Sequence, residues 1–186
     1  MLSLNKVAIR QKILDLRETL DTAELEKKSS QIFNRLIGLK GIKGAKKILS
    51  YVSFKSEVKT KDLIDWLARR GVTVYLPAFD EQNQKYVIRR FGGWDKLKPG
   101  PCQILQPTSV NMIADVDVAI VPGVAFSKSG ARLGYGKGVY DRLLLGSKAF
   151  KIGIAYDFQI VDSLPQEERD VVMDLVISEK NIYGGR

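Results

Sequence analysis

The chain has 186 residues, 45% hydrophobic and 27% charged, with a formal net charge of +9 at pH 7. It contains no histidine and a single cysteine, which excludes Ser-His-Asp and Cys-His catalytic groups, histidine-ligated metals and an internal disulfide. The size and composition predict one globular domain, residues 1–186, whose remaining residue types suit the binding of polyanions.

The sequence gives no sign of a membrane segment or of a nucleic-acid tail. No apolar run approaches the roughly 20 residues that span a bilayer, and the first ten residues lack the apolar stretch of a secretory leader. No block of lysine and arginine resembles a basic tail. We therefore expect a cytoplasmic, monomeric protein that binds neither membrane nor nucleic acid.

The first predicted element is a helix over residues 4–20. Its apolar side chains share one stripe at helical spacing, namely Ile9, Ile13, Leu16 and Leu20. Three cations lie along the edge of this stripe, namely Lys6, Arg10 and Arg17. They either line a cleft or are solvated, and the helix alone favours solvation.

The first half of the chain then alternates between helix and strand. A second helix is predicted over 22–38, capped by Asp21 with Glu24. A strand over 47–52 and a loop over 53–58, here called the Glu57 loop, precede a helix that runs from a Thr60 cap to Arg70. Strands are predicted over 72–76, ending at Pro77, and over 86–91. Residues 92–109 are rich in glycine and proline and are predicted to be a long connection.

The second half predicts strands over 116–121, 151–155 and 172–178, the last strand of the chain, and a helix over 138–146. Continuous apolar strands separated by helices predict a three-layer α/β fold, a mostly parallel sheet with helices on both faces. Ligands bind at the carboxyl ends of such strands. The loops at 53–58, 122–138 and 156–170 follow strand ends, so we expect them to meet in one crevice.

The segment over residues 130–138, here called the glycine loop, is the strongest functional signal. Gly134, Gly136 and Gly138 alternate between a predicted strand and helix, the arrangement that presents backbone N–H groups to phosphate. The spacing fits neither the P-loop pattern nor the dinucleotide-binding pattern. A flexible turn is the alternative, and the cations and carboxylate clustered within and just after the loop argue against it.

At these residues the chain resembles a known family. The run Pro122–Phe126 and the run from Gly130 to Arg142 closely resemble the signature of the 5-formyltetrahydrofolate cyclo-ligases, also called 5,10-methenyltetrahydrofolate synthetases. Weaker matches in the same order extend the resemblance over nearly the whole chain: Lys6 and Arg10, Tyr51 to Thr60, Leu76-Pro77, Pro107, and Asp170 to Glu179. Val139 stands where the family usually has an aromatic residue.

The resemblance implies the conversion of 5-formyltetrahydrofolate to 5,10-methenyltetrahydrofolate with ATP and Mg²⁺, releasing ADP and phosphate. An N-formyl group is a poor electrophile. Phosphorylation of the formyl oxygen makes that oxygen a leaving group, and N10 of the folate then attacks the carbon. The protein needs no nucleophile of its own, but it must align two ligands and neutralise charge on the γ-phosphate.

The resemblance also implies the residues of the site. Lys137 and Arg132 are the expected catalytic residues. The expected ATP contacts are Lys6, Arg10, Arg132, Leu133, Gly134, Tyr135, Gly136, Lys137, Gly138, Val139 and Tyr140. The folate, polyglutamylated forms included, is expected to contact Tyr51, Val52, Phe54, Glu57, Tyr135, Gly136, Lys137, Gly138 and Val139. Mg²⁺ is expected at Asp141 and Asp170, directly or through water.

Structural roles remain open for several of these residues. Tyr51 is also expected in a core, Phe54 as a loop anchor, Asp141 in a first helical turn and Asp170 as a cap. Trp66 and Trp94 are expected to pack, and Cys102 is assigned no role because no base is visible near it.

Two other functions remain open. The first is a small nucleotide-dependent kinase or ligase with another acceptor, which would bind ATP without folate turnover. The second is a basic RNA-binding module, which would lose affinity steeply with salt and would not bind ATP.

Overall fold

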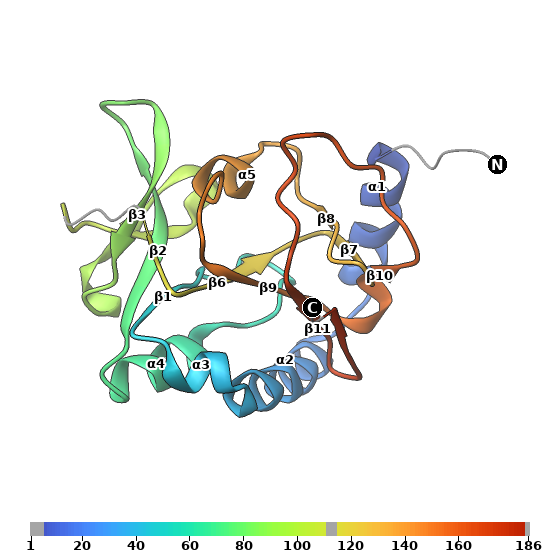
Figure 1. The fold of residues 1–186 in the computed structure, drawn as a ribbon, viewed down its shortest axis with the longest axis horizontal. Coiled ribbons are helices and arrows are strands. Elements are labelled where there is room, and N and C mark those ends of the chain that lie inside the picture. The colour runs from blue at the N-terminus through green and yellow to red at the C-terminus, as the bar shows by residue number, and fades with distance from the viewer. Residues whose placement is uncertain (1–5, 111–114, 185–186) are drawn as a thin grey trace.

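The computed structural model describes residues 6–110 and 115–184. A seven-stranded sheet runs through its centre in the order β12-β11-β9-β6-β1-β2-β3 (Figure 1). Its strands are β1 (Lys47–Leu49), β2 (Thr73–Asp80), β3 (Lys85–Arg90), β6 (Val118–Pro122), β9 (Phe150–Ile154), β11 (Leu175–Ile177) and β12 (Ile182–Gly184). The five inner strands are parallel and the two edge strands are antiparallel, which confirms the mostly parallel sheet.

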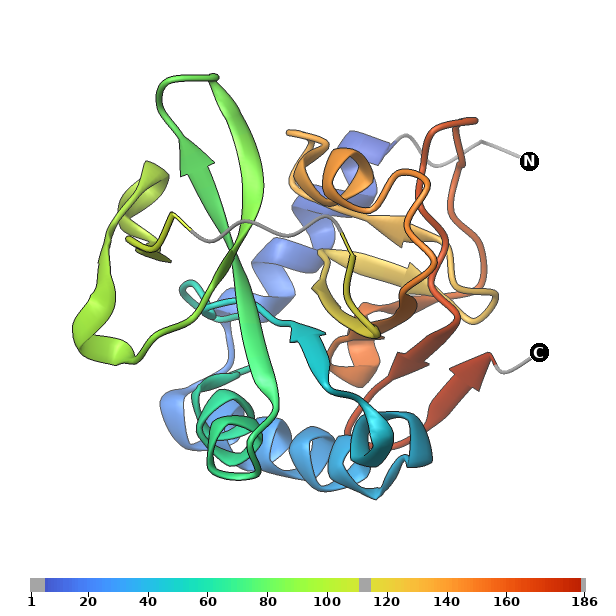
Figure 2. The same ribbon diagram turned by 60° about the vertical axis from the view of Figure 1, so that its left-hand side comes forward.

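Helices cover both faces of this sheet (Figures 1 and 2). One face packs against α2 (Thr22–Gly38), α3 (Lys40–Gly44) and α4 (Lys61–Arg69). The other face packs against the segment around α5 (Val139–Leu143). Within the described residues, no helix has the length and apolarity that crossing a bilayer requires.

The alternation of side chains along the strands explains why both faces are covered. In β6, Val118 and Ile120 point to the α2–α4 side, whereas Ala119 and Val121 point to the α5 side. All four are buried. A strand that is apolar at every position must be buried on both faces, so the sequence of β6 requires the three-layer arrangement.

The first helix, α1 (Lys6–Glu18), packs away from the main sheet. Ile9 and Ile13 contact a small sheet made of β7 (Ala125–Ser127), β8 (Arg132–Leu133) and β10 (Ile160–Val161). The predicted apolar stripe is wrong at Leu16, which is 42% exposed, while Arg17 is buried. Arg17 can be buried because its guanidinium donates to Ser56 and to Tyr135.

The region predicted to be a long connection contains structure. It holds two short 3₁₀ turns, η1 (Trp94–Lys96) and η2 (Pro101–Gln103), and a two-stranded ribbon of β4 (Leu97–Pro99) and β5 (Leu105–Pro107). Gln106 anchors the ribbon to β2, since its side-chain oxygen accepts from the backbone N–H of Phe79 at 2.7 Å. Glycine and proline have low strand propensity, so the ribbon depends on this contact with a distant part of the chain.

Several predicted boundaries differ from the structure. The strand predicted over 47–52 ends at Leu49, the one over 172–178 is confined to 175–177, and β12 follows it as the last strand. The prediction that β2 stops at Pro77 is wrong, because β2 continues to Asp80. Pro77 lies beyond the last residue of β2 that pairs with β1, so its missing N–H costs no bond to that strand.

Of the two predicted helix caps, Asp21 is confirmed and Thr60 is wrong. Asp21 caps α2, since its Oδ1 accepts from the N–H of Glu24 at 2.8 Å. Thr60 precedes α4 but does not cap it with its side chain; its hydroxyl donates to the carbonyl of Tyr51 instead. That bond joins Thr60, just after the Glu57 loop, to Tyr51, just before it.

Candidate active site

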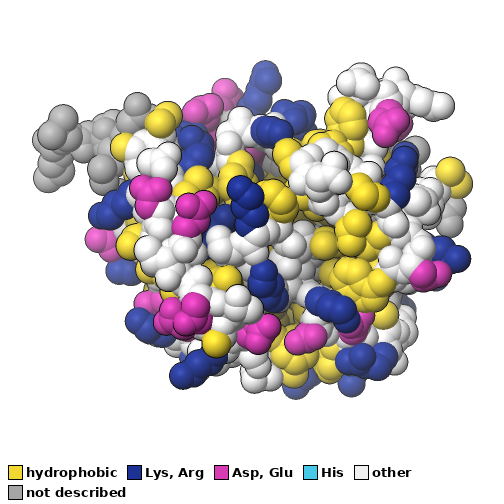
Figure 3. Space-filling view, turned by 180° about the vertical axis from the view of Figure 1, so that it is seen from behind, with side chains coloured by type: hydrophobic (Ala, Val, Ile, Leu, Met, Phe, Trp, Pro, Cys, Tyr) yellow, Lys and Arg dark blue, Asp and Glu magenta, His cyan; other side chains and the backbone are white. Residues whose placement is uncertain are grey.

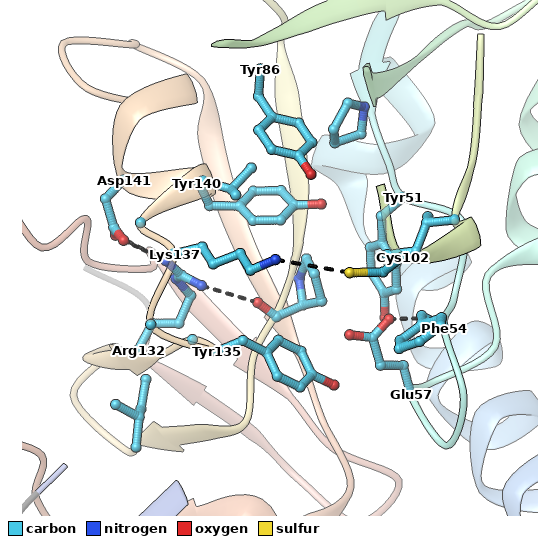
Figure 4. A pocket seen from close by; sticks show the side chains of 18 of the residues that line it. Tyr51, Phe54, Glu57, Tyr86, Cys102, Arg132, Tyr135, Lys137, Tyr140 and Asp141 are labelled. Carbon is cyan, nitrogen blue, oxygen red and sulfur yellow. Dashed lines mark hydrogen bonds and ion pairs between the residues drawn. The ribbon is translucent and has the colours of Figure 1, made fainter. Parts of the chain in front are cut away.

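A cavity of about 540 Å³ opens at the carboxyl ends of the central strands. The three loops predicted to meet there all contribute to its wall, through Phe54 and Glu57, through the glycine loop, and through Glu167 and Asp170. Figure 4 shows the glycine loop on one side of the cavity and the Glu57 loop on the other. Every residue that the sequence assigned to a site lines this cavity.

The glycine loop has the backbone conformations that explain its sequence. Gly136 and Gly138 have φ angles of +96° and +58°, which side chains with a Cβ rarely adopt. A Cβ at Gly134 would lie 2.8 Å from Nη1 of Arg132. Arg10 fixes the loop from α1, because its Nε donates to the carbonyl of Gly134 at 2.9 Å.

The helix after the glycine loop is shorter than predicted. It spans Val139–Leu143 rather than 138–146, and the chain turns at Gly146 with φ +72°. Only one turn of helix follows the loop, so its dipole is small. The loop's backbone N–H groups and nearby cations are therefore the main positive features on this side.

Arg132 and Asp141 form a tight ion pair in this wall. Nη2 of Arg132 lies 2.9 Å from each oxygen of Asp141, and the N–H of Val171 donates to the same carboxylate at 3.3 Å. The Arg132 side chain is 5% exposed, and its Nε is buried with no hydrogen-bond partner within the described chain. An orphaned donor on a cavity wall is a position where an acceptor of a ligand would be favourable.

A second ion pair joins α1 to the loop before β11. Nζ of Lys6 lies 2.8 Å from Glu167 and 2.9 Å from Asp170. Burial opposes ionisation of Asp170, but the bonds from Lys6 and from the N–H of Glu167 outweigh it and lower the pKa of Asp170. The bond from the Glu167 N–H closes a turn and not a helix end, so the predicted helix-cap role of Asp170 is wrong.

The amine of Lys137 is oriented across the cavity. It is an exposed side chain whose Nζ lies 3.8 Å from Sγ of Cys102, on the opposite wall (Figure 4). A thiol is a weak acceptor, so this contact leaves the amine available to an anionic ligand.

Glu57 is the carboxylate of the opposite wall, and its environment differs from that of the aspartates. It is 7% exposed and Oε2 accepts from the N–H of Phe54 at 2.9 Å. Burial raises the pKa of Glu57, although the Phe54 N–H, Arg17 and Tyr135 each act in the opposite direction. A buried carboxylate with spare acceptor positions suits a ligand that presents N–H donors.

Aromatic side chains line the space between the walls (Figure 4). Tyr51 is 3% exposed, and its hydroxyl donates to the carbonyl of Val58 at 3.1 Å, so it is a core residue that also contributes to the wall. Burial raises the pKa of Tyr135 and of Tyr140 above the usual range. Both tyrosines are therefore neutral donors and apolar surface at ordinary pH.

Sequence reasoning missed one part of the wall. Its residues come from the β2–β3 hairpin and the β4–β5 ribbon: Pro77, Tyr86, Pro101, Cys102, Ile104 and Leu105. The ribbon lies in the segment predicted to be an irregular connection, so no local pattern identified these residues. The only available signal was the apolar character of Ile104 and Leu105 within a polar, proline-rich stretch. Trp66 and Trp94 pack against the core, as predicted.

The residues present fit a divalent cation held together with a phosphate ligand. Among residues 6–110 and 115–184, no three acidic or sulfur ligands gather into a complete metal site. Asp141 and Asp170 nevertheless line the same cavity as the glycine loop. Mg²⁺ typically takes one or two carboxylates and fills its remaining positions with phosphate and water.

Comparison with known proteins identifies one family. A family model described as the 5-formyltetrahydrofolate cyclo-ligase family matches residues 3–179. The NMR structure of Aquifex aeolicus 5,10-methenyltetrahydrofolate synthetase is 33% identical, with a TM-score of 0.87 over 97% of this chain and 93% of that one. The Mycoplasma pneumoniae 5,10-methenyltetrahydrofolate synthetase is 28% identical, with a TM-score of 0.74 over 94% and 99%.

Curated relatives match over similar lengths. The 5-formyltetrahydrofolate cyclo-ligase of Haemophilus influenzae is 31% identical, covering 91% of this chain and 95% of that protein. That of Mycolicibacterium smegmatis is 32% identical, covering 95% and 94%. The residues matched by the family model, 3–179, span both walls of the cavity.

Proposed function

Because the chain belongs to the 5-formyltetrahydrofolate cyclo-ligase family, and is therefore a ligase, we propose that it converts 5-formyltetrahydrofolate to 5,10-methenyltetrahydrofolate. The observation that carries the proposal is one cavity with two different walls. The glycine loop and its cations suit a triphosphate, while Glu57 and the tyrosines suit a flat ring with N–H donors. A reaction between a nucleotide and a folate needs both walls in contact with one space.

We assign ATP to the glycine-loop wall. The loop offers backbone N–H groups, and Lys6, Arg10 and Lys137 supply positive charge from two sides. Arg132 contributes less directly than its sequence position suggests, because one of its nitrogens already binds Asp141. Its Nη1 donates to the carbonyl of Pro122 at 3.4 Å and its Nε is buried without a partner in the described chain, so Arg132 would contribute mainly positive charge to the phosphate side.

Asp141 and Asp170 would hold Mg²⁺, which would supply positive charge to the phosphate side when bound. In the ligand-free arrangement, Arg132 and Lys6 neutralise these carboxylates instead. Each aspartate is therefore paired with a cation that is also suited to phosphate, so this wall carries balanced charge.

We assign the folate to the opposite wall. Glu57 would accept from the N–H groups of the pterin ring, and the rings of Phe54, Tyr135 and Tyr140 would contact its faces. Val52 and Tyr51 complete the floor on this side. The anionic tail, with one glutamate or several, would be drawn toward a protein of net positive charge.

The chemistry requires alignment and charge neutralisation. The formyl oxygen attacks the γ-phosphorus and ADP leaves; N10 then attacks the activated carbon and phosphate departs with the former formyl oxygen. Lys137 would neutralise charge on the transferring phosphoryl group, since its amine reaches across the cavity without a carboxylate partner in the described structure. The site provides no nucleophile, and this reaction needs none.

The face of the molecule seen in Figure 3 gives no separate support to the RNA-binding alternative. On the face seen in Figure 3, Lys and Arg side chains are interspersed with Asp and Glu. A nucleic-acid footprint is expected to gather positive charge on one face or along one helix. The monomeric state and cytoplasmic location stay predictions from the sequence.

The test is the absorbance band of methenyltetrahydrofolate, followed as protein is added to 5-formyltetrahydrofolate and MgATP. Growth of the band with the wild-type protein, and its loss in folded Lys137→Ala and Asp141→Ala variants, would support the assignment. ATP binding without growth of the band would leave a nucleotide enzyme with another acceptor. RNA binding without ATP binding would overturn the proposal altogether.

A further inference from the structure

We propose that Arg17 is a positioning residue of this site, which holds Tyr135 of the glycine loop and the Glu57 loop in register across the cavity. The inference rests on the folate role proposed for Glu57. Arg17 does not line the cavity, and it lies on α1 beyond the two cations that do, Lys6 and Arg10.

The guanidinium of Arg17 joins two segments that are distant in sequence. Its Nε donates to Oγ of Ser56 at 3.0 Å, and its Nη2 donates to the hydroxyl of Tyr135. Its central carbon also lies 5.6 Å from the centroid of the Tyr135 ring. One side chain on α1 thus binds both the Glu57 loop and the glycine loop.

Burying Arg17 costs more free energy than a purely structural link would require. It is 2% exposed, and both of its hydrogen-bond partners are neutral hydroxyl groups. Burial of a guanidinium on neutral partners is costly, and a neutral side chain of similar length would fill the same space. The retained charge has one clear effect nearby, since it favours the ionised form of Glu57.

Tyr135 transmits this effect to the carboxylate. A phenol hydroxyl donates one hydrogen bond while it accepts another. Because Arg17 occupies the acceptor side of the Tyr135 hydroxyl, the hydroxyl proton is left to point toward the carboxylate of Glu57, whose ionised form Tyr135 favours. Figure 4 shows the Tyr135 hydroxyl and Glu57 facing one another across the cavity.

Several groups act on Glu57 besides Arg17. One is a second cation, Lys59, which follows the Glu57 loop. The others are the phenols of four tyrosines from separate parts of the fold: Tyr51, Tyr135, Tyr140 and Tyr156. Of the two cations, Lys59 is half-buried and its amine donates to the carbonyl of Lys55. Arg17 is the buried one, so its loss changes the environment of Glu57 most.

The inference predicts an effect on folate and not on ATP. Without Arg17, Tyr135 loses its fixed orientation and Glu57 takes up a proton more readily, so the acceptor for the pterin N–H groups is lost. We expect Arg17→Met to raise the folate KM about 10- to 30-fold, as for loss of a hydrogen bond to a charged group, while the ATP KM changes less than about twofold.

The primary measurement is a titration of Glu57 in the ligand-free protein by ¹³C NMR of the carboxyl carbon, assigned with Glu57→Gln. In Arg17→Met the titration midpoint moves to higher pH, and the acid limb of kcat/KM for folate moves with it. Arg17→Lys, which keeps the charge but not the two-armed geometry, restores the midpoint more fully than the KM. Lys12→Met, on the exposed side of α1, is the matched control and changes neither.

A double-mutant cycle separates positioning from general stability. Tyr135→Phe removes only the hydroxyl, so its effect and that of Arg17→Met overlap if both act through one chain of bonds. If Arg17→Met does not fold, Tyr135→Phe and Arg17→Lys carry the test. An unchanged Glu57 midpoint, or additive effects with equal losses in folate and ATP KM, would overturn the inference. A shifted midpoint in a protein without folate turnover would retain the positioning role and reject the proposed function.

Discussion

The two walls of the cavity use the same chemical group in opposite ways. Asp170, on the glycine-loop wall, has its pKa lowered by Lys6 despite burial. Glu57, on the opposite wall, has its pKa raised by burial despite a backbone N–H and a nearby guanidinium. One wall has ion pairs that a charged ligand can replace, whereas the other keeps a carboxylate poorly solvated.

The difference indicates what each wall is suited to bind. The ion pairs Arg132–Asp141 and Lys6–Asp170 each contain a cation and a carboxylate. They suit a ligand with both negative and positive charge, such as a metal–phosphate complex, because the cation can bind the phosphate and the carboxylate can bind the metal. A single buried carboxylate instead gains most from a neutral ligand that brings N–H donors. Changes to each wall should therefore affect different substrates.

The largest expected effect comes from removing the free amine of the glycine-loop wall. We expect Lys137→Met to lower kcat by roughly 10²- to 10³-fold, as for loss of one group that stabilises developing charge. The unfolding temperature should stay near that of the wild type, because Lys137 is exposed. Steady-state kinetics and thermal unfolding measure both quantities. Lys12→Met is the matched control, and equal losses in the two variants would contradict the assignment.

The second effect concerns the opposite wall. We expect Glu57→Gln to lower kcat/KM for the folate by about 10- to 100-fold, with ATP affinity unchanged by calorimetry. Because the pKa of Glu57 is raised by folding, its contribution to stability is present at low pH and is lost as pH rises through that pKa. The variant should therefore unfold at a higher temperature than the wild type at pH 7, and this advantage should vanish under acidic conditions. A lower unfolding temperature at pH 7 would contradict the pKa direction.

A smaller effect should separate the two partners of Lys6. We expect Asp170→Asn to raise the KM for MgATP about tenfold, consistent with loss of one charged contact, whereas Glu167→Gln should change it less than about twofold because Glu167 is 75% exposed. Asp170 has a lowered pKa, so its stabilising effect is present above about pH 4 and is lost as pH falls below that. The wild type and Asp170→Asn should accordingly converge in unfolding temperature at acidic pH. Equal effects of the two substitutions on KM would show that Lys6, not the carboxylate, matters.

The smallest effect is expected at Cys102. Its thiol contacts Lys137 across the cavity, but the reaction needs no thiol, so Cys102→Ser should alter kcat/KM by less than about twofold. Steady-state assays under reducing conditions measure this. A loss of tenfold or more would place the thiol in the chemistry and blur the distinction between the walls.

The sequence predicted the architecture well where the physical signal is local. Continuous apolar strands such as residues 118–121 require burial on both faces, and Asp21 with Glu24 marks a helix start, so the parallel sheet and α2 followed directly. The β4–β5 ribbon could not be predicted in this way, since it is held by Gln106 bonding to a distant strand. Pro77 was misleading for the same reason. A proline is accepted at this position in β2 because β1 ends before it and needs no hydrogen bond from it, and the sequence around Pro77 does not show where β1 ends.

For the candidate site, residue identity was predictable and pairing was not. The glycine loop and the strand-end loops indicated which residues would meet, and the cavity contains them. Nothing local indicated that Arg132 binds Asp141 or that Arg17 would be buried where a leucine was expected. Such pairs depend on which side chains the fold brings close together, and the spacing of residues along a single sequence does not reveal this.

The order of strands in the sheet also determines how late in protein synthesis this cavity can form. β1 lies between β2 and β6, so the centre of the sheet joins residues 47–49 to residues 118–119, and Lys6 reaches Asp170 across 164 positions. On a ribosome adding about 5–20 residues per second, the first helix waits roughly 10–30 s for its last partner to be made. During synthesis Lys6 therefore lacks both of its carboxylate partners until residue 170 has been made, and the cavity cannot be completed before then.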